Sequence, residues 1–344
     1  MRLQISCFVP EVKVYLEEVR LVDPYQEDLF RGDECFTGRL QGWQRWTSPS
    51  PEPPADPVLN GLIIASLQRR GPYLAGLHDC LLERILAKVE PDKLLLVGIL
   101  RAGLYVSVGL ARRLQAQAYQ VPVVALALFH EAGIDQFALE SIRQDYPDRI
   151  PVFIDGWTGR GVVARELKVA LPDSILATLV DPGHHGDLWG TDMDTLVESA
   201  HFSATETLGF SRAYIKDPTE IWKTYKYPDR FRNEGLISAW TDVFDCSPLP
   251  LQEEKASVQN TSELLAFLAE LAGTDTGQWK VNINEVVRAL VNRNPQELIL
   301  ASSCEAAAID FPTVVHSALK RAIPIKYLPE MRRRFNCLAA VLLP

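Results

Sequence analysis

The chain lacks the long hydrophobic runs of a membrane protein. Its longest apolar stretches, such as Val121 to Phe129, have the length of a buried strand and fall short of the roughly 20 residues that cross a bilayer. The N-terminus has neither the basic start nor the long apolar middle of a secretory signal. We therefore expect a cytoplasmic protein without membrane contact.

Clustered cysteines are also missing. The six cysteines stand at least 28 positions apart, which excludes a zinc knuckle and a dense disulfide framework. Two adjacent histidines between Gly183 and Gly186 have no third ligand nearby in the sequence, so a loop is favoured there over a metal site. We expect reduced, mostly packed cysteines and no metal-ligand cluster.

What the sequence does have is enough material for two domains. A chain of 344 residues exceeds the size at which one hydrophobic core normally keeps growing, and 47% hydrophobic with 23% charged residues is ordinary for a globular protein. The net charge of −9 is uneven, because residues 255–344 hold 10 Lys+Arg and 8 Asp+Glu, which leaves −11 for residues 1–254. Such asymmetry can mark different partners for the two parts.

Two segments mark the expected joints. Residues 48–57 contain five prolines, which excludes a continuous helix or strand, and residues 247–260 are polar and coincide with the change in charge. We therefore divide the chain into four parts: a lead-in with a Pro-rich linker (1–57), a first domain (58–246), a linker (247–260) and a second domain (261–344).

Both domains alternate between helical and strand patterns, which predicts an α/β fold with a parallel sheet in the first domain and a smaller α/β unit after it. In the first domain we expect helices at about 58–89, 104–118 and 162–171, and buried strands at 94–97, 121–128, 152–154 and 175–180. In the second we expect helices at 262–271, 284–293 and 314–321, and strands at 297–302, 323–327 and 338–343.

Two strand-to-helix turns of the first domain could carry chemistry, because ligands bind at the carboxyl ends of strands in open α/β sheets. The turn after Val97 combines Arg101, Gly103 and a helix N-terminus, which suits a polyphosphate; an ordinary turn with a solvated arginine is an equal alternative. In the next turn, Asp155 can accept hydrogen bonds from sugar hydroxyls, and Thr158 to Gly161 can form a nest for one phosphate. A simple tight turn is the alternative there.

These motifs resemble those of a known family. Ile-Leu-Arg-Ala-Gly at 99–103, followed at Asp155 by Asp-x-x-Thr-Gly, is similar to the pyrophosphate and phosphoribosyl-pyrophosphate loops of type I phosphoribosyltransferases. Residues 133–135, 153–161 and 208–212 resemble the phosphoribosyltransferase-like family encoded beside bacterial tellurite-resistance and stress genes. Some members of that family carry the label cysteine protease StiP.

The resemblance implies a type I phosphoribosyltransferase-like domain and a role for each motif residue. Arg101, with Ala102 and Gly103, would bind the pyrophosphate, and Asp155 would hold the ribose hydroxyls; these two charged residues are the catalytic candidates. Mg²⁺ would bridge the ribose and the pyrophosphate. The 5′-phosphate would lie in a loop made of Trp157, Thr158, Gly159, Arg160 and Gly161.

Two departures from the family pattern favour a second hypothesis. Gly156 stands where type I transferases carry a second acid, and Phe129 to Gly133 lacks the arginines that relatives show before the Gly-Ile-Asp motif. These differences fit a non-catalytic sensor that binds a ribose-phosphate ligand and transmits this to an RNA or protein partner.

The second domain resembles a different fold. Asn282 to Arg293, followed by a strand, is similar to the Gly-x-Asn-Glu-Val-Thr-Lys signature of the RNA-binding fold shared by Pelota's C-terminal domain and ribosomal kink-turn proteins. This implies that Asn284, Glu285 and Arg288 contact structured RNA. Asn282 replaces the signature glycine, and an amphipathic helix with an Asn cap is the alternative.

The sequence therefore favours a Mg²⁺-dependent phosphoribosyltransferase-like protein that acts on phosphoribosyl pyrophosphate and an unidentified base or nucleotide in a stress response. The sensor is the first alternative. A cysteine protease is a minor one, because it needs a thiolate beside a histidine, and neither Cys304 nor His316 lies in a recognised proteolytic motif. A homodimer is left open.

Overall fold

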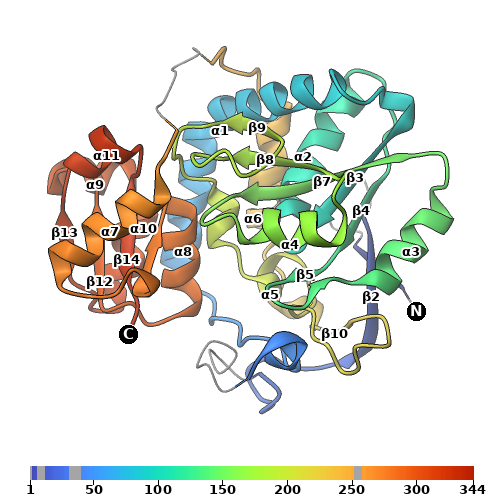
Figure 1. Ribbon diagram of the computed structural model, residues 1–344, viewed down its shortest axis with the longest axis horizontal. Helices are drawn as coiled ribbons and strands as arrows, with labels where there is room; N and C mark the ends of the chain where they lie inside the picture. The colour runs from blue at the N-terminus through green and yellow to red at the C-terminus, as the bar shows by residue number, and fades with distance from the viewer. Residues whose placement is uncertain (1, 6–11, 31–39, 252–257) are drawn as a thin grey trace.

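The protein consists of a large and a small α/β unit that lie side by side (Figure 1). The computed structural model describes residues 2–5, 12–30, 40–251 and 258–344. Cys7, Cys35 and part of the expected linker at 247–260 fall outside these ranges. None of the helices in the described ranges has the length and apolar character needed to cross a membrane.

The large unit is built on an eight-stranded sheet of order β1-β2-β4-β3-β7-β8-β9, with β10 paired to β2. Every pair in it is parallel except β1 with β2. The expected apolar runs form its centre, and β3 is buried along its whole length. The strands are β1 (Arg2–Ile5), β2 (Val12–Leu21), β3 (Leu94–Ile99), β4 (Val123–Leu126), β7 (Ile150–Trp157), β8 (Ile175–Val180), β9 (Leu188–Thr191) and β10 (Lys223–Lys226). A separate hairpin joins β5 (Leu128–Phe129) to β6 (Gly133–Ile134).

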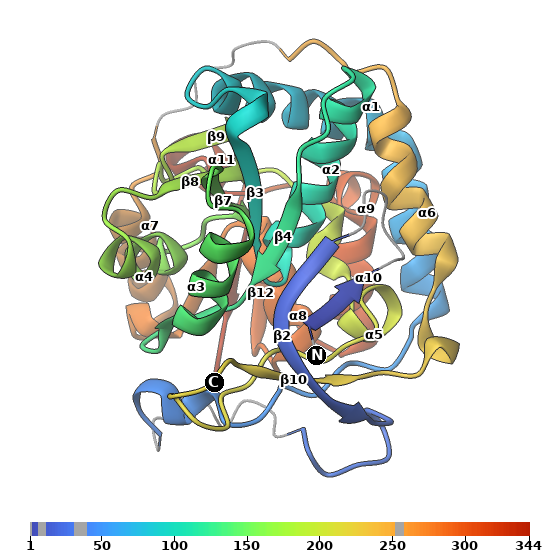
Figure 2. The ribbon, with the colours of Figure 1, turned by 90° about the vertical axis from the view of Figure 1, so that its right-hand side faces the viewer.

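Helices cover both faces of this sheet, as Figure 2 shows. One face carries α1 (Pro57–Leu86), α2 (Ala102–Ala116) and α6 (Glu234–Asp242), and the other carries α3 (Gln136–Asp145) and α4 (Val162–Ala170). Asp56 caps α1 by accepting hydrogen bonds from the first backbone N–H groups, and Asp135 caps α3 in the same way. The expected parallel sheet covered by helices is therefore present.

The lead-in is not set apart from the large unit. Val12, Val14 and Leu16 of β2 are fully buried, and β2 lies between β1 and β4 in the main sheet. Residues 48–56 form neither helix nor strand, and α1 begins at Pro57, but the segment is packed: Glu52 is only 6% exposed. The proline pattern indicates an irregular segment, but it carries no information on whether the residues before and after that segment pack on one core.

The small unit has a mixed four-stranded sheet of order β11-β14-β12-β13. Its helix α7 is capped by Asn260, whose side chain accepts the N–H of Glu263. Asn282, before α8, has φ +74°, a left-handed conformation that favours glycine and that asparagine tolerates. The strands are β11 (Trp279–Val281), β12 (Glu297–Leu300), β13 (Ile325–Tyr327) and β14 (Ala339–Leu342); the helices are α7 (Thr261–Ala272), α8 (Ile283–Asn292), α9 (Cys304–Asp310), α10 (Pro312–Lys320) and α11 (Glu330–Phe335).

The two units share one continuous hydrophobic core. Helix α10 packs against α1, and α8 packs against the short helix η4 (Glu198–His201) of the large unit. Val286 and Leu290 of α8 belong to the same buried cluster as Leu67 and Leu104 of the large unit. The boundary between the units is therefore a packed interface, which positions α8 over the carboxyl ends of the large sheet's strands.

Candidate functional site

The two predicted turns meet at the carboxyl ends of β3 and β7, which are neighbouring parallel strands. They pack so closely that a Cβ on Gly103 would lie 1.8 Å from the carbonyl oxygen of Ile154. Close backbone approach, and not a left-handed φ, thus requires glycine at position 103. A Cβ on Gly156 would lie 3.0 Å from that of Ala102, so the same contact restricts both turns.

Beside these turns lies a cavity of about 330 Å³, which we call the arginine cavity because Arg101, Arg212 and Arg288 line it. Arg212 donates a hydrogen bond to Ser50 at 2.7 Å, and its guanidinium lies 4.2 Å from the ring centroid of Trp46. Three cations from distant parts of the chain and one carboxylate, that of Glu285, therefore line one small volume, and the excess of positive charge favours a negatively charged ligand.

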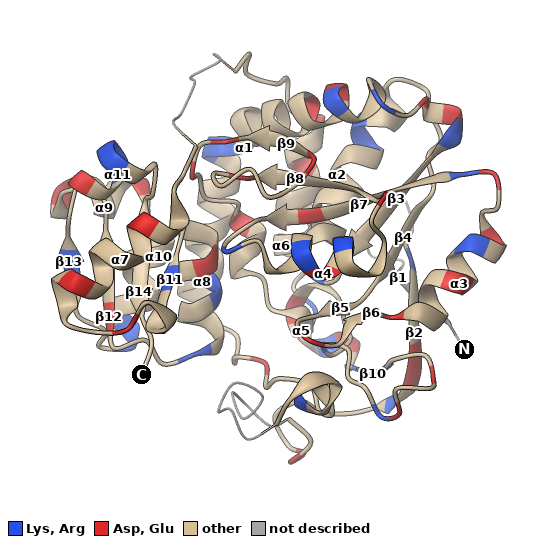
Figure 3. Cartoon of the chain, viewed as in Figure 1, with Lys and Arg blue, Asp and Glu red and all other residues tan. Residues whose placement is uncertain are grey.

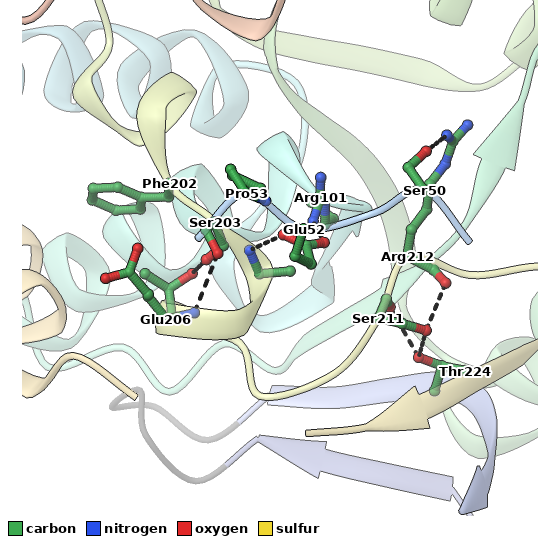
Figure 4. Close-up of polar contacts among 12 residues, drawn as sticks. Ser50, Glu52, Pro53, Arg101, Phe202, Ser203, Glu206, Ser211, Arg212 and Thr224 are labelled. Atoms are coloured by element: carbon green, nitrogen blue, oxygen red, sulfur yellow. Dashed lines mark hydrogen bonds and ion pairs between the residues drawn. The ribbon is translucent and has the colours of Figure 1, made fainter. Parts of the chain in front are cut away.

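Arg101, however, is already neutralised. Its guanidinium donates to Oε1 of Glu52 at 2.7 Å, and the second Glu52 oxygen accepts the N–H of Ala204 (Figure 4). Burial is the largest single effect and acts against the charged form, but the Glu52 carboxylate together with Tyr105 and Tyr227 outweighs it and raises the pKa of Arg101 above its ordinary value. Arg101 was expected to bind the pyrophosphate of a ligand. In this structure the Glu52 carboxylate occupies that position beside the Arg101 guanidinium.

Arg288 is in the opposite situation. Its guanidinium donates to the carbonyl oxygens of Ala200 (2.9 Å) and Phe202 (3.1 Å), and no carboxylate in the described part of the chain forms an ion pair with it. Burial and the neighbouring Arg101 lower its pKa to about 10. Arg288 therefore remains charged at neutral pH in a partly buried position. It forms no ion pair with a carboxylate of the described residues, and Glu52 and Glu285 act on it only at longer range.

The loop from Trp157 to Gly161 borders a second cavity, of about 210 Å³, which we call the loop cavity. Asp155 lines it; its Oδ1 accepts the N–H of Gly156 at 2.8 Å, and burial, with a smaller effect of Glu285, raises its pKa to about 7. The Thr158 hydroxyl, expected to hold a phosphate, donates instead to Asp181. The loop's backbone still leads directly into the N-terminus of α4.

The residues predicted to contact RNA face the large unit. Asn284 is 1% exposed; its amide donates to the carbonyl of Thr195 and accepts the N–H of Val197, both at 2.8 Å. Glu285 accepts the indole N–H of Trp157 at 3.0 Å. Figure 3 shows charged residues where α8 meets the large unit. RNA contact through Asn284, Glu285 and Arg288 would require this interface to open, and it stays a prediction.

Two residues of the site were missed by sequence reasoning. Glu52 lies in the Pro-rich segment, where nothing marks an ion-pair partner of Arg101. Arg212 ends the Leu208 to Arg212 motif, which carried the family resemblance but received no role. Only the folded chain brings these residues to the turn after β3.

The cysteines do not form a recognisable catalytic pair in the described residues. None of the hydrogen bonds there joins a cysteine to a histidine, and burial raises the pKa of the Cys80 and Cys337 thiols, which opposes thiolate formation. Cys304 is exposed, while His316 contacts Asp56 at 3.1 Å. Within the same residues, no three His, Cys, Asp or Glu side chains are grouped so that they could hold a metal.

Comparison with known proteins corrects the expected activity. A family model described as tellurite-like stress resistance cysteine protease StiP matches residues 50–229. The protein named cysteine protease StiP from Acinetobacter baylyi is 32% identical over 80 residues, which are 23% of this chain and only 21% of that protein. The expectation of a phosphoribosyltransferase is wrong by this description, whereas the expected stress context agrees with it. Because residues 50–229 are more than half of its length, the chain belongs to the tellurite-like stress resistance cysteine protease StiP family.

Proposed function

We propose that the protein acts in stress resistance by binding an organic phosphate across the arginine and loop cavities. The observation that carries this proposal is Arg288, a partly buried cation that has carbonyl partners and forms no ion pair among the described residues. A desolvated charge is costly until it is paired, so an anion in this cavity would relieve that cost.

The surrounding groups favour phosphate over other anions. Guanidinium groups bind phosphate oxygens through paired hydrogen bonds, and Arg212 lines the same cavity as Arg288. The loop before α4 offers backbone N–H groups at a helix N-terminus, a common phosphate site. Arg101, Ala102 and Trp157 line both cavities, so one extended ligand can occupy them together.

Magnesium stays part of this proposal as a companion of the ligand. Asp155, the residue expected to hold the ribose hydroxyls, lines the loop cavity. Its carboxylate becomes an oxygen ligand for Mg²⁺ once it ionises near pH 7. Phosphate oxygens of the ligand would supply the other contacts. We therefore expect Mg²⁺ to strengthen ligand binding more at pH 8 than at pH 6.

Calorimetry of the full chain with pyrophosphate and adenosine monophosphate, with and without Mg²⁺, tests the proposal. Arg288→Met should weaken binding about tenfold or more, because a hydrogen bond to a charged group is lost. Arg332→Met, on the exposed face of α11, is the matched control and should leave binding unchanged. The proposal fails when neither anion binds the wild-type chain, or when both variants bind equally well.

The finer fold assignments remain proposals of the same kind. The parallel order β4-β3-β7-β8, with loops at its carboxyl ends, supports a likeness to phosphoribosyltransferase-like domains in fold alone. The left-handed Asn282 before α8, at the place of a signature glycine, supports the likeness of the small unit to Pelota's C-terminal domain. Since Asn284 is buried, we expect the intact chain to retain kink-turn RNA poorly in a filter assay.

The activity in the family description is the second candidate function, and the match over residues 50–229 is what favours it. Cys304 is the exposed thiol in the described ranges, and Cys7 and Cys35 lie outside them. Hydrolysis of a fluorescent casein substrate, measured before and after iodoacetamide, tests for a catalytic thiol. Single Cys→Ser variants at these three positions then identify it, and activity that survives iodoacetamide would contradict a cysteine mechanism.

A further inference from the structure

A third cavity, of about 340 Å³, lies between the two units, and its volume is at the lower end of the range for small-molecule sites. The start of α1, the ends of α8 and α10, and the short helix α5 (Ala204–Thr207) contribute its walls. Leu59, Leu290 and Val291 give it an apolar side, and Glu206 and His201 give it a polar side. We call it the glutamate cavity.

Glu206 is a buried carboxylate that has amide partners but no counter-ion. It is 7% exposed, its Oε1 accepts the Asn60 amide at 2.7 Å, and no Lys, Arg or His of the described residues forms an ion pair with it. Burial raises its pKa. Figure 4 shows the Glu206 side chain directed away from the ion pair of Glu52 and Arg101. Arg101 therefore pairs with Glu52 and not with Glu206.

The two cations that line the glutamate cavity are also committed to other groups. Lys320 donates to Oδ2 of Asp56 at 2.8 Å, and the same oxygen also contacts His316. Arg321 donates to the backbone carbonyl of Leu290 and to other groups at the end of α8. Glu206 is therefore the charged group of the cavity that still lacks a partner of opposite sign.

His201 is another polar residue of the cavity wall. It is 4% exposed, and its two ring nitrogens are closed off from solvent and have no hydrogen-bond partner among the described residues. Burial, and to a lesser extent Arg288, lowers its pKa to about 3, so the ring is neutral and presents one N–H donor and one acceptor. Such buried, unpaired groups destabilise the folded chain.

We propose that the glutamate cavity binds an organic ammonium, a primary amine on a small apolar body. The ammonium group pairs with the Glu206 carboxylate, and the apolar body lies against Leu59, Leu290 and Val291. This site is separate from the proposed phosphate site and does not depend on it.

Calorimetry of the full chain with benzylamine and with benzyl alcohol tests this, because the two probes share an apolar body and differ in charge. Benzylamine should bind about tenfold more tightly or better, since a hydrogen bond to a charged group is worth at least that. Glu206→Gln should remove the difference between the probes. Glu270→Gln, on an exposed position of α7, is the matched control and should keep it.

A second variant tests the proposal independently, in case Glu206→Gln does not fold. Val291→Trp places a large side chain in the cavity and should abolish binding of both probes while thermal unfolding stays cooperative. Equal affinities for the two probes, unchanged benzylamine binding in either variant, or no benzylamine binding to the wild-type chain would each overturn the proposal.

Discussion

The arginine and glutamate cavities share two walls and differ in the sign of the charge they leave unpaired. Residues 198–207 border both: Ser199 and Phe202 line the first, and His201 and Glu206 line the second. Helix α8 likewise gives Arg288 to one and Leu290 to the other. Two adjacent segments can therefore build sites of opposite preference, because residues close in sequence point into different volumes.

The difference teaches that pairing, and not the number of charges, sets the preference of a cavity. Arg101 and Arg288 line the same cavity, but Glu52 pairs with the first, whereas the second donates to carbonyl groups and forms no ion pair within the described residues. Asp56 and Glu206 differ in the same way, since Lys320 pairs with the first alone. The following experiments break or sharpen this contrast.

The largest expected effect comes from opening the interface that forms both cavities. Asp194 is 4% exposed and accepts the N–H groups of Ile283 and Leu338 in the small unit, and burial raises its pKa to about 7. The folded state thus keeps a proton that the unfolded chain releases near pH 4. Its contribution to stability is full below pH 4 and is lost as the pH rises through 7, a change on the order of 4 kcal/mol.

Urea unfolding from pH 5 to pH 8 measures this loss. Asp194→Asn should flatten the fall in the free energy of unfolding, although Asp155, whose pKa is also about 7, will keep part of it. Asp229→Asn, whose side chain is 76% exposed, serves as the control. Parallel curves for the wild-type chain and Asp194→Asn would show that Asp194 does not titrate in this range.

A smaller effect is expected from Asn284→Ala. The substitution leaves the Thr195 carbonyl and the Val197 N–H buried without partners, which should cost about 2–4 kcal/mol of stability. Binding of pyrophosphate and of benzylamine should weaken together, because both cavities need α8. Asn292→Ala, exposed on the same helix, should change stability by less than about 0.5 kcal/mol.

Releasing Arg101 should affect one cavity alone. Glu52→Gln keeps an acceptor for Ala204 but removes the carboxylate that neutralises Arg101, so pyrophosphate should bind roughly tenfold more tightly. Glu90→Gln, at an exposed position, is the control. Weaker pyrophosphate binding in Glu52→Gln would mean that Glu52 positions Arg101 for the ligand and does not compete with it.

The smallest effect tests whether the two cavities are independent. Glu206→Gln should change pyrophosphate affinity, and Arg288→Met should change benzylamine affinity, by no more than about twofold, as for sites that share no direct partner. Titration calorimetry of the double variant shows whether its change in binding free energy equals the sum of the changes in the two single variants. A larger mutual effect would show that residues 198–207 transmit binding from one cavity to the other.

Much of the fold followed from the sequence because its signals are local. The helix expected at 58–89 lies at Pro57–Leu86, and the apolar runs became the central strands of the large sheet. Pairing between distant segments has no local signal. The position of β2 beside β4, and the shared core under α8, depend on which buried faces meet, and so the lead-in and the small unit looked more separate than they are.

The site followed the same rule. The turns at Arg101 and Asp155 were found because strand ends and glycines mark them, and the structure brings them together. What holds each charge was not found: Glu52 on Arg101 and the carbonyl groups on Arg288 come from other elements. The predicted RNA residues show the limit most clearly, since the helix pattern located Asn284 but not the surface it faces.

The place of β2 in the sheet has a consequence for biosynthesis. Lys13 pairs with Val124 and Glu17 with Lys223, partners that leave the ribosome more than a hundred and more than two hundred residues later. Strand β1 precedes β2 and can pair with it at once, but at about 5–20 residues per second β2 waits roughly 5–40 s for β4 and β10. A strand edge left unpaired can join another chain during that time, and the charges at Lys13, Glu17 and Arg20 counteract such pairing in the nascent protein.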